Sequence, residues 1–525
     1  MNLLQESWVP VVARDGRTGC IAPWQLSASA NREIAAPRPD FQGAVYQFLI
    51  GLLQTAFAPT DHDEWLELWR APPTADDLKV ALEPLVGAFQ LLATSENPAF
   101  LQDFDMPDGE QKPIAALLID APGGKTLKDN LDHFVKGGMV SGVCESCAAM
   151  ALFTLQTNAP SGGVGHRVGL RGGGPLTTLL IPPGDSSLWH KLWLNVLPEE
   201  ILSAGKTQVA DAAVFPWMAP TRTSEKNGLA TLPSDVNPLQ MYWGTPRRIR
   251  LEHENNGPGA CDLCGTESAR LITHFRTRNY GVNYYGPWVH PLTPYRFDPK
   301  KQNPPLSLKG QQGGMGYRHW LSFNWCDDAN GDQAALNVRN YNDERQGDIE
   351  GTLSLWCFGY DMDNMKARCW YEQQMPVMHV NAKYQLLFIQ FVSMLTNTAR
   401  DVVKEVRSQV KAAWFSRPKD VKGDTSMIDS MFWQATESEF YQQLFLLADQ
   451  PENTRHMPSS VAQKWLRTLN THALDVFDHW VLEGDAEDMD MKRITRARRE
   501  LARKLKTTKS LKNLEQIATA TTEVA

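Results

Sequence analysis

Two cysteine pairs with identical spacing are the residues of this sequence best suited to chemistry. Cys144 and Cys147 lie in CESC, and Cys261 and Cys264 lie in CDLC. Each CxxC turn can place two sulfurs on one side of an ion, and four thiolates form the tetrahedron that zinc prefers. The pairs lie much farther apart in the chain than those of a compact zinc ribbon. We therefore predict one zinc ion that joins two distant segments of a single fold.

Two other interpretations of these cysteines remain open. A redox CxxC is one, although neither pair lies in a strand-to-helix context like that of thioredoxin. Buried cysteines without a metal are the other. A closed four-thiolate site has no position for substrate, so the zinc prediction implies a structural role and no catalysis. The other cysteines are expected in the core: Cys20, Cys326, Cys357 and Cys369.

Glycine and arginine gather in two stretches that suit nucleic acid. Residues 161–174 read SGGVGHRVGLRGGG, and glycine lets bare backbone amides approach a phosphate or a groove floor. A flexible connection is the alternative. Arg276 and Arg278 lie among Tyr280, Tyr284, Tyr285 and Trp288, a mixture that suits phosphates, a minor groove or stacked bases. A half-buried strand with a solvated arginine face fits these residues equally well.

A basic segment lies near the C-terminus, and motifs of enzymes are missing from the sequence. MKRITRARRELARKLKTTKSLK predicts a basic helix that either follows a DNA strand or forms a solvated bundle face. PGGKT lacks the first glycine of a Walker A loop, and GVGHRVG misses the dinucleotide-binding fingerprint by one residue. The sequence has no HExxH. Enzyme activity thus has no positive support.

The sequence pattern divides the chain into two parts, which must position these residues. Residues 1–376 mix short apolar runs with frequent Gly and Pro, which predicts an irregular α/β domain. Residues 377–525 carry apolar side chains at helical spacing, including Phe388, Leu395, Val402, Trp465 and Trp480. We expect an α+β protein whose mixed N-terminal domain holds the zinc and whose C-terminal domain is a four-helix bundle.

Composition limits the classes of partner. The net charge of −8 argues against a protein that coats nucleic acid by bulk attraction, although a local basic face is still allowed. No apolar run approaches the length of a membrane helix, and the start lacks the features of a secretion signal. We expect a cytoplasmic protein without a membrane partner.

In combination, these motifs resemble a known family. The start with MNLL and WVPV, CESCAAMALF, APSGGVGHRVGLRGGGP, CDLCG and the helical C-terminal part are similar to the CasA-type large subunit of the type I-E CRISPR Cascade complex. The resemblance implies a non-enzymatic subunit of an RNA-guided antiviral surveillance complex. Such a subunit reads the protospacer-adjacent motif (PAM) in duplex DNA, promotes duplex opening and R-loop formation, and recruits the helicase-nuclease. The implied partners are other Cascade subunits, the CRISPR RNA, the target duplex and its displaced strand.

The resemblance also assigns roles to residues. The zinc ligands are Cys144, Cys147, Cys261 and Cys264, and the minor-groove loop includes Gly162, Gly163, Val164 and Gly165, with valine where the family pattern favours glycine. A basic minor-groove residue is implied near Arg276, Arg278 and Asn279. A wedge at a hairpin tip falls on Asp363, Asn364 and Met365, which departs from the glutamine-bearing pattern. Phe134 and Lys136 correspond to a segment near the 5′ end of the guide.

Two competing hypotheses come from other classes of function. One is a zinc-stabilised hydrolase or nuclease, which predicts metal-dependent cleavage by the purified chain. The other is a purely architectural subunit of a ribonucleoprotein, which predicts DNA binding that is indifferent to substitution of Arg276 and Arg278.

Overall fold

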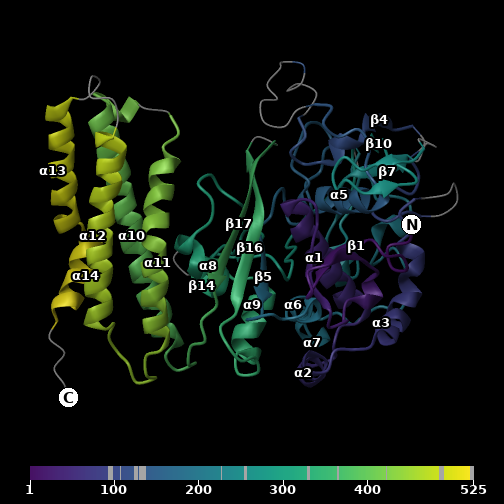
Figure 1. Cartoon of the computed structure of the whole chain (residues 1–525), viewed down its shortest axis with the longest axis horizontal. Coiled ribbons are helices and arrows are strands. Elements are labelled where there is room, and N and C mark those ends of the chain that lie inside the picture. The colour runs from purple at the N-terminus through teal and green to yellow at the C-terminus, as the bar shows by residue number, and fades with distance from the viewer. Residues whose placement is uncertain are drawn as a thin grey trace. The chain divides into compact units, whose positions relative to one another are not determined.

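The computed structural model describes residues 1–92, 98–106, 108–122, 128, 137–225, 228–252, 257–327, 331–363, 366–420, 423–483 and 490–520. The chain forms two compact units. Met1–Gly310 and Ala335–Glu372 make the first, and Gln311–Ala334 and Gln373–Ala525 make the second. The second unit thus includes a segment that the sequence-based division at residues 376 and 377 leaves in the N-terminal domain. The mixed α/β first unit and the helical second unit confirm the predicted fold class (Figure 1).

Small sheets and short pairings make up the strands of the first unit. Three sheets have three strands each, in the orders β2-β1-β3, β4-β10-β7 and β17-β16-β5. Their strands are β1 (Val9–Ala13), β2 (Thr18–Ile21), β3 (Asn31–Ile34), β4 (Glu110–Pro113), β5 (Thr177–Ile181), β7 (Arg248–Glu252), β10 (His274–Arg278), β16 (Ser354–Asp363) and β17 (Lys366–Pro376). The short pairs are β6 (Ala230–Thr231) with β11 (Asn283–Tyr284), β8 (Gly259–Ala260) with β9 (Glu267–Ser268), and β12 (Tyr295–Arg296) with β13 (Leu306–Ser307).

One buried helix forms the centre of the first unit. Helix α1 (Pro39–Ala56) starts with proline at its first position and is buried on nearly all sides. It approaches its neighbours closely at two glycines, because a Cβ at Gly43 would lie 2.5 Å from the Phe358 ring and one at Gly51 would lie 3.0 Å from Tyr242. The other helices of the unit are α2 (His62–Arg70), α3 (Ala75–Leu82), α5 (Glu145–Asn158), α6 (Leu188–Trp193), α7 (Glu199–Leu202) and α9 (Leu336–Asn340).

The described part of the second unit contains five long helices. They are α10 (Gln385–Trp414), α11 (Ser426–Ala448), α12 (Ser459–Leu482), α13 (Met491–Thr507) and α14 (Lys509–Thr519). Helices α10, α11 and α12 run alongside one another, and α13 and α14 follow end to end in the fourth position of the bundle (Figure 1). The predicted stripe is buried at Phe388, Leu395, Val402 and Trp465, whereas Trp480 is half-buried. Helix α8 (Trp320–Asn324) and the pair β14 (Cys326–Asp327) and β15 (Asp332–Gln333) complete the unit.

Short helical turns connect these elements. The 3-10 helices are η1 (Pro23–Gln25), η2 (Glu83–Ala88), η3 (Ile114–Leu117), η4 (Pro216–Met218), η5 (Pro233–Asp235), η6 (Pro238–Tyr242), η7 (Tyr317–His319) and η9 (Pro418–Asp420), and η8 (Tyr341–Arg345) is a π-helix. Among the helices of the described residues, none is both long and apolar enough to span a bilayer.

Candidate metal centre and nucleic-acid surface

The four predicted cysteine ligands converge in the first unit. The sulfurs of Cys144, Cys147, Cys261 and Cys264 all lie within 4.8 Å of one another, and the Sγ atoms of Cys144 and Cys264 are 3.7 Å apart. A tetrahedron with metal–sulfur distances of about 2.3 Å has sulfur–sulfur separations of about 3.8 Å. All four cysteines are free of disulfides. The donor set and its spacing therefore fit a metal ion.

Hydrogen bonds from nearby backbone amides hold the two CxxC turns in position. Cys144 caps the start of α5, where its Sγ accepts from the Cys147 amide at 3.4 Å. In the second turn, the Gly265 amide donates to Cys261 O at 2.8 Å. Asp262 joins the turns, because its Oδ2 accepts from the amides of Ser141 and Gly142 at 2.6 and 2.9 Å. The cysteine cluster thus lies at a junction that the protein holds by hydrogen bonds.

Neighbouring thiols in the cluster shift one another's pKa. Hydrogen bonding with Cys144 and Cys261 raises the pKa of Cys147 far above its usual value, and burial adds to this. Hydrogen bonding from Cys144 and Cys147 lowers the pKa of Cys261 well below its usual value. Several adjacent thiolates repel one another without a cation, and a divalent ion removes that repulsion. Within the cluster Cys264 is exposed, while the other three cysteines are buried.

The expectation for the remaining cysteines is only partly correct. Cys357 is buried in β16, and Cys326 is partly exposed. Cys20 and Cys369 are exposed, so the prediction that they lie in the core is wrong. Both lie on outer strands of their sheets, where alternate side chains face solvent.

The glycine loop and the segment after β10 lie side by side, although more than a hundred residues separate them in the sequence. Asn279 Nδ2 donates to Val164 O at 2.8 Å, and the Tyr280 amide donates to Gly165 O at 2.8 Å. Gly165 has φ +77°, and a Cβ there would lie 2.9 Å from Asn279 Cβ and from the Tyr280 ring. Only glycine fits this position without displacing its neighbours. The loop is therefore a supported surface and not a loose connection.

Part of the glycine loop is exposed to solvent. Val164 is 76% exposed, and Gly163 is also exposed. Tyr280 adopts φ +68°, an uncommon conformation for a non-glycine residue that is often found where function constrains the backbone. At Gly163 the backbone is accessible, because among the described residues a Cβ there would approach nothing more closely than His166, at 3.9 Å.

The far end of the glycine-rich stretch contacts the β16–β17 hairpin. Gly174 has φ +60°, and a Cβ there would lie 2.6 Å from Met362 Cγ. The hairpin is anchored in the core, because Tyr360 Oη donates to Asp40 Oδ2 at 2.6 Å. One continuous stretch thus connects two of the predicted DNA-contacting regions, the turn at Asn279 and the hairpin that carries Asp363.

The tip of this hairpin lies largely outside the described residues. Asn364 and Met365 fall there, as do Phe134 and Lys136, which were predicted near the guide. Strand β16 ends at Asp363 and strand β17 begins at Lys366. Asp363 is 51% exposed and pairs with Arg368 at 3.3 Å. Part of its negative charge is therefore compensated within the hairpin.

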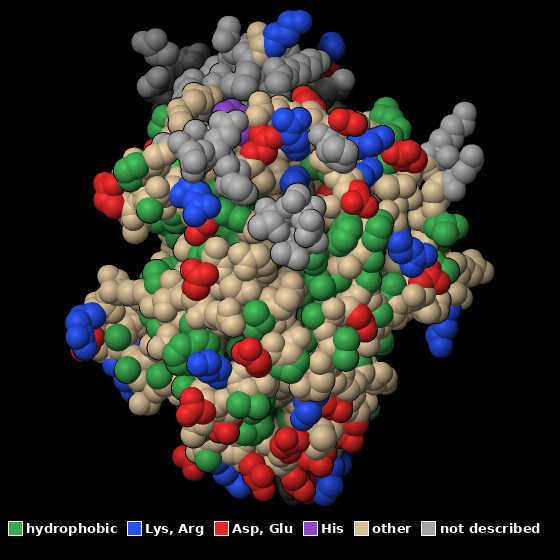
Figure 2. All heavy atoms as spheres, turned by 90° about the vertical axis from the view of Figure 1, so that its right-hand side faces the viewer, with side chains coloured by type: hydrophobic (Ala, Val, Ile, Leu, Met, Phe, Trp, Pro, Cys, Tyr) green, Lys and Arg blue, Asp and Glu red, His purple; other side chains and the backbone are tan. Residues whose placement is uncertain are grey.

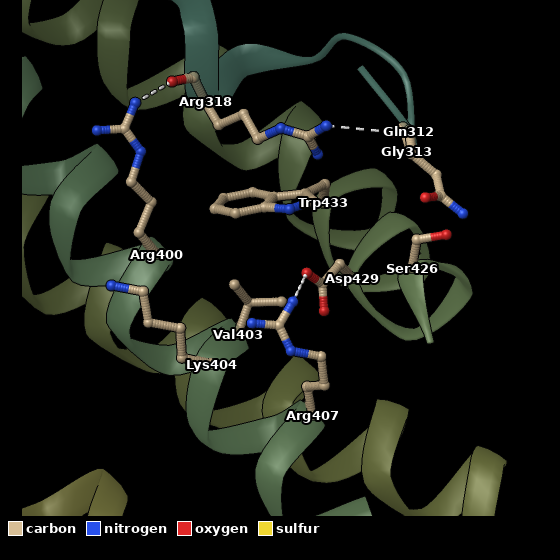
Figure 3. A pocket seen from close by; sticks show the side chains of 10 residues that line it. All are labelled: Gln312, Gly313, Arg318, Arg400, Val403, Lys404, Arg407, Ser426, Asp429 and Trp433. Atoms are coloured by element: carbon tan, nitrogen blue, oxygen red, sulfur yellow. Dashed lines mark hydrogen bonds and ion pairs between the residues drawn. The ribbon is translucent and has the colours of Figure 1, made fainter. Parts of the chain in front are cut away.

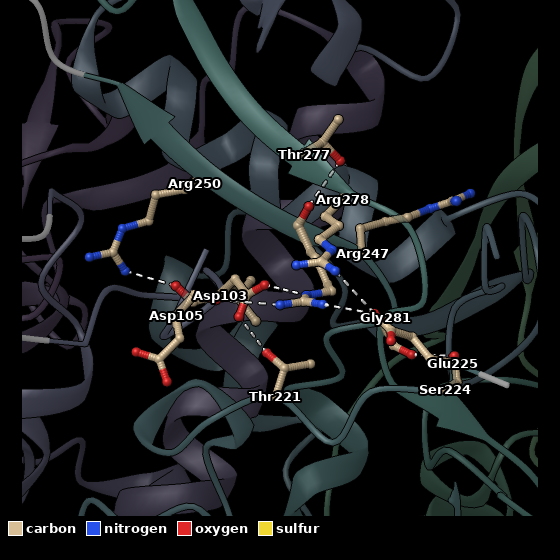
Figure 4. A network of polar contacts seen from close by, with 12 residues as sticks. Asp103, Asp105, Thr221, Ser224, Glu225, Arg247, Arg250, Thr277, Arg278 and Gly281 are labelled. Atoms are coloured by element: carbon tan, nitrogen blue, oxygen red, sulfur yellow. Dashed lines mark hydrogen bonds and ion pairs between the residues drawn. The ribbon is translucent and has the colours of Figure 1, made fainter. Parts of the chain in front are cut away.

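One of the predicted arginines, Arg278, belongs to a network of polar contacts that also includes Arg250 and Glu225 (Figure 4). Arg276 pairs with Glu252, and Arg278 Nη2 lies 3.5 Å from Glu225 Oε1. Across the sheet, Arg276 faces Arg250, and Arg278 faces Arg248. This arrangement fits the alternative of a half-buried strand with a solvated arginine face, and acidic partners neutralise much of its charge.

Sequence reasoning missed several members of this region. Arg248 and Arg250 alternate with apolar Ile249 and Leu251, a period-two signal that could have identified the second arginine strand. Buried Arg248 pairs with fully buried Asp103, which indicates a structural role. Arg247 donates to Pro160 O just before the glycine loop, and burial lowers its pKa to about 10. No local pattern identifies Arg247, because the fold alone brings it to the loop.

The surface of the first unit carries both signs of charge. The face in Figure 2 has Lys and Arg interspersed with Asp and Glu, and acidic side chains gather toward its lower end. Neither positive nor negative side chains cover this face alone. A mixed surface of this kind does not attract an anionic partner by bulk charge.

The basic C-terminal segment forms α13 and part of α14. Its apolar stripe is buried at Ile494, Leu501 and Leu505. Arg498 contacts Asp478 at 2.7 Å through two nitrogens, and Lys504 lies 3.6 Å from Glu405. These pairs favour the interpretation as a solvated face of the bundle.

Comparison with known proteins identifies the family. The family model described as CRISPR-associated protein Cse1 matches residues 2–476. The fold is similar to CasA (Cse1) of Thermus thermophilus, with TM-score 0.68 at 19% identity over 96% of this chain and 99% of that one. Cse1 of Thermobifida fusca gives TM-score 0.66 at 16% identity over 99% of both chains. A chain of a structure named CRISPR RNA-guided surveillance complex gives TM-score 0.67 at 14% identity, covering 97% of this chain and 99% of that one. The chain therefore belongs to the CRISPR-associated protein Cse1 family.

Proposed function

We propose that this chain is the large subunit of a CRISPR RNA-guided surveillance complex that recognises the PAM in double-stranded DNA. In this proposal the protein approaches the minor groove with the glycine loop, promotes duplex opening and R-loop formation with the hairpin, and recruits the helicase-nuclease. Its partners are the other Cascade subunits, the CRISPR RNA, the target duplex and the displaced strand. It acts in the cytoplasm, without a membrane partner, and has no enzymatic role of its own.

The observation that best supports the proposal is that other segments hold the exposed glycine loop in place at both of its ends. Asn279 and Tyr280 hold the loop at Val164 and Gly165, and Met362 of the hairpin packs against Gly174. The minor groove displays a degenerate pattern of acceptors, so backbone and one or two polar side chains are enough to read a short motif with some tolerance. A supported, glycine-rich loop is suited to this, because the glycines on either side of Val164 let the backbone approach a groove about 6 Å wide.

In this proposal, Arg276 and Arg278 can exchange their carboxylate partners for DNA phosphates. Arg276 and Arg278 are 40% and 50% exposed, and their carboxylate partners Glu252 and Glu225 belong to the protein itself. Exposed ion pairs contribute about 0–1 kcal/mol, so a phosphate can replace the carboxylate at small cost. Replacing both arginines with glutamine should weaken duplex binding and reduce its salt dependence. Unchanged binding would favour the architectural alternative.

The hairpin is the proposed wedge. Its strands β16 and β17 give it a rigid base, and insertion between base steps costs a few kcal/mol that contacts to the opened strands offset. Replacing Asn364 and Met365 with alanine should reduce duplex opening, followed with a base-analogue fluorophore, more than initial binding. Equal loss in both would exclude the wedge.

The proposed metal is zinc, held by Cys144, Cys147, Cys261 and Cys264. A four-thiolate site is closed, so the ion supplies folding free energy and fixes the two CxxC turns relative to each other. Any nuclease activity would then need another site.

The deciding experiment compares reconstituted guide-RNA complexes with and without this chain. Affinity is measured at a fixed salt concentration for target duplexes that differ only in the flanking motif. Discrimination that requires the chain supports PAM recognition. Discrimination that persists without it would remove that role and leave an architectural one.

A further inference from the structure

One buried arginine belongs to the glycine-rich stretch itself. Arg171 directly precedes three consecutive glycines, and it is only 7% exposed. Its Nη1 donates to the hydroxyls of Thr177 and Thr293, at 3.2 and 2.9 Å, and its Nη2 donates to Gln47 Oε1. Helix α1 thus provides one acceptor, strand β5 another, and a segment farther along the chain the third. One side chain therefore connects the glycine-rich stretch to three separate parts of the first unit.

Backbone contacts next to Arg171 close the base of the glycine loop. The Gly169 amide donates to Ala159 O at 3.1 Å, so the chain enters and leaves the loop at neighbouring positions. A Cβ at Gly169 would lie 2.6 Å from Thr157 O, so the two segments approach each other closely. Ser307 Oγ donates to the Arg171 carbonyl. The guanidinium therefore enters the core two residues beyond the point where the loop closes.

The charge of Arg171 is held by neutral groups. Among the residues that the structure describes, no carboxylate pairs with this guanidinium. Burial lowers the pKa of Arg171 to about 10, so the side chain is still protonated at neutral pH. Removing a charge from water is costly, and an apolar side chain of similar size would avoid that cost. Core packing alone therefore does not explain why an arginine lies here.

A cavity in the second unit shows the more usual arrangement. Arg318, Arg400 and Arg407 line this cavity (Figure 3). Arg407 pairs there with Asp429, so attraction between opposite charges helps to hold it. At Arg171 the hydrogen bonds alone define the orientation, because the donors of a guanidinium form a rigid planar fork. Such a fork meets acceptors on three elements only when those elements are correctly placed.

We propose that Arg171 is a positioning residue for motif recognition, because its guanidinium fixes the base of the glycine loop against α1 and β5. In this way it sets the path of the exposed backbone at Gly163 and Val164. The inference rests on the function proposed above for the loop. Recognition by backbone depends on where the amides lie, and a displacement of about 1 Å is enough to weaken contacts strongly. Arg171 itself touches no DNA and acts through the loop.

Two neighbouring threonines of β5 provide a matched test. Both are buried, but Thr177 hydrogen-bonds with Arg171 and Gln47, whereas Thr178 Oγ1 has no partner among the described residues. Valine removes the hydroxyl and keeps a branched side chain of similar size. Thr177→Val should reduce discrimination between flanking motifs about threefold or more, because it removes an acceptor of the guanidinium. Thr178→Val should leave discrimination unchanged.

A second pair of variants separates positioning from stability. Arg345 is also buried, donates to the Val196 carbonyl, and has its guanidinium carbon 3.9 Å from the centroid of the Trp65 ring. Arg171→Met and Arg345→Met should both lower the melting temperature, because each leaves buried acceptors unpaired. Only Arg171→Met should reduce motif discrimination, by about tenfold or more. If Arg171→Met does not fold, the threonine pair provides the test.

Hydrogen exchange of the glycine loop adds a readout that needs no DNA. In the full-length chain, peptides that cover residues 160–170 should exchange about threefold faster or more in Thr177→Val and Arg171→Met, because the base of the loop opens more often. Thr178→Val and Arg345→Met should leave this exchange unchanged. Mass spectrometry measures the exchange, and discrimination is measured with the reconstituted guide-RNA complex at a fixed salt concentration.

The outcomes separate this inference from the function on which it rests. Faster loop exchange with reduced discrimination in Thr177→Val, and neither change in Thr178→Val, supports the positioning role. Unchanged exchange in Thr177→Val would overturn it, and so would faster exchange with full discrimination, which would make the contact purely structural. If discrimination by the wild-type complex does not depend on this chain, the proposed function fails and removes the role in recognition. The exchange data then still show whether Arg171 holds the loop.

Discussion

The cysteine cluster and the glycine loop belong to the same compact unit, yet they are built in opposite ways. In the cluster, four side chains carry the chemistry, and the backbone only presents them. In the loop, the backbone is the proposed recognition surface, and side chains such as Asn279 and Met362 support it. Loss of a ligand should therefore affect folding first, whereas a change in the loop should affect recognition first. The following experiments test that division, from the largest expected effect to the smallest.

Cys264→Ser should have the largest effect. The variant is expected to lose the metal and more than about 4 kcal/mol of unfolding free energy, because metal binding is coupled to folding. Cys264 is exposed, so the substitution leaves no buried cavity to confuse the result. Metal content by mass spectrometry and the melting temperature measure both quantities. Cys369→Ser, at another exposed thiol, is the control, and an unchanged melting temperature in both variants would refute a structural metal.

Gly165→Ala should impair recognition while leaving the fold intact. The new Cβ meets Asn279 and Tyr280 at a positive φ, so the loop must shift, and we expect about a tenfold loss of discrimination between flanking motifs. The measurement is duplex affinity of the reconstituted complex. Gly184→Ala is the matched control, because Gly184 has φ +71° with nothing within 4 Å of its Cβ position. A similar loss of discrimination in both would mean that backbone strain, and not loop shape, is responsible.

Asn279→Ala should have a smaller effect of the same kind. It removes the 2.8 Å hydrogen bond to Val164 O, which contributes about 0.5–1.5 kcal/mol, so motif discrimination should fall by a few fold. Asn303→Ala removes a comparable exposed hydrogen bond, to Asp298, and should leave discrimination unchanged. If Asn279→Ala changes the melting temperature but not discrimination, the contact is only structural.

Asp363→Asn should have the smallest effect. Its exposed pair with Arg368 contributes little, so unfolding free energy should change by less than about 0.5 kcal/mol. Removing a negative charge at the hairpin end should nevertheless increase duplex affinity at low salt, with the gain lost at high salt. Asp185→Asn, at another exposed aspartate paired with arginine, is the control. A decrease in duplex affinity would place this end of the hairpin away from the phosphates.

Local patterns in the sequence were sufficient to predict features that depend on a single helix or motif. The spacing of Phe388, Leu395 and Val402 predicted α10, and two CxxC motifs predicted the thiol cluster. The exposed Cys20 and Cys369 show the limit of this reasoning, because composition gives no indication of which face of an outer strand meets solvent. The break between α13 and α14 at Thr508 likewise had no clear signal within the basic segment.

The sequence by itself determined the side-chain chemistry of this protein: four thiols in two equal turns, a glycine-rich loop, an arginine strand and a helical C-terminal part. Only the tertiary structure decided what lies next to what. It placed Asn279 against Val164, Met362 against Gly174 and Arg318 beside Arg400, all of them contacts between segments far apart in the chain. The physical reason is that periodicity and motif spacing report a residue's own element, whereas a surface built from backbone shape or gathered charge depends on how remote elements pack.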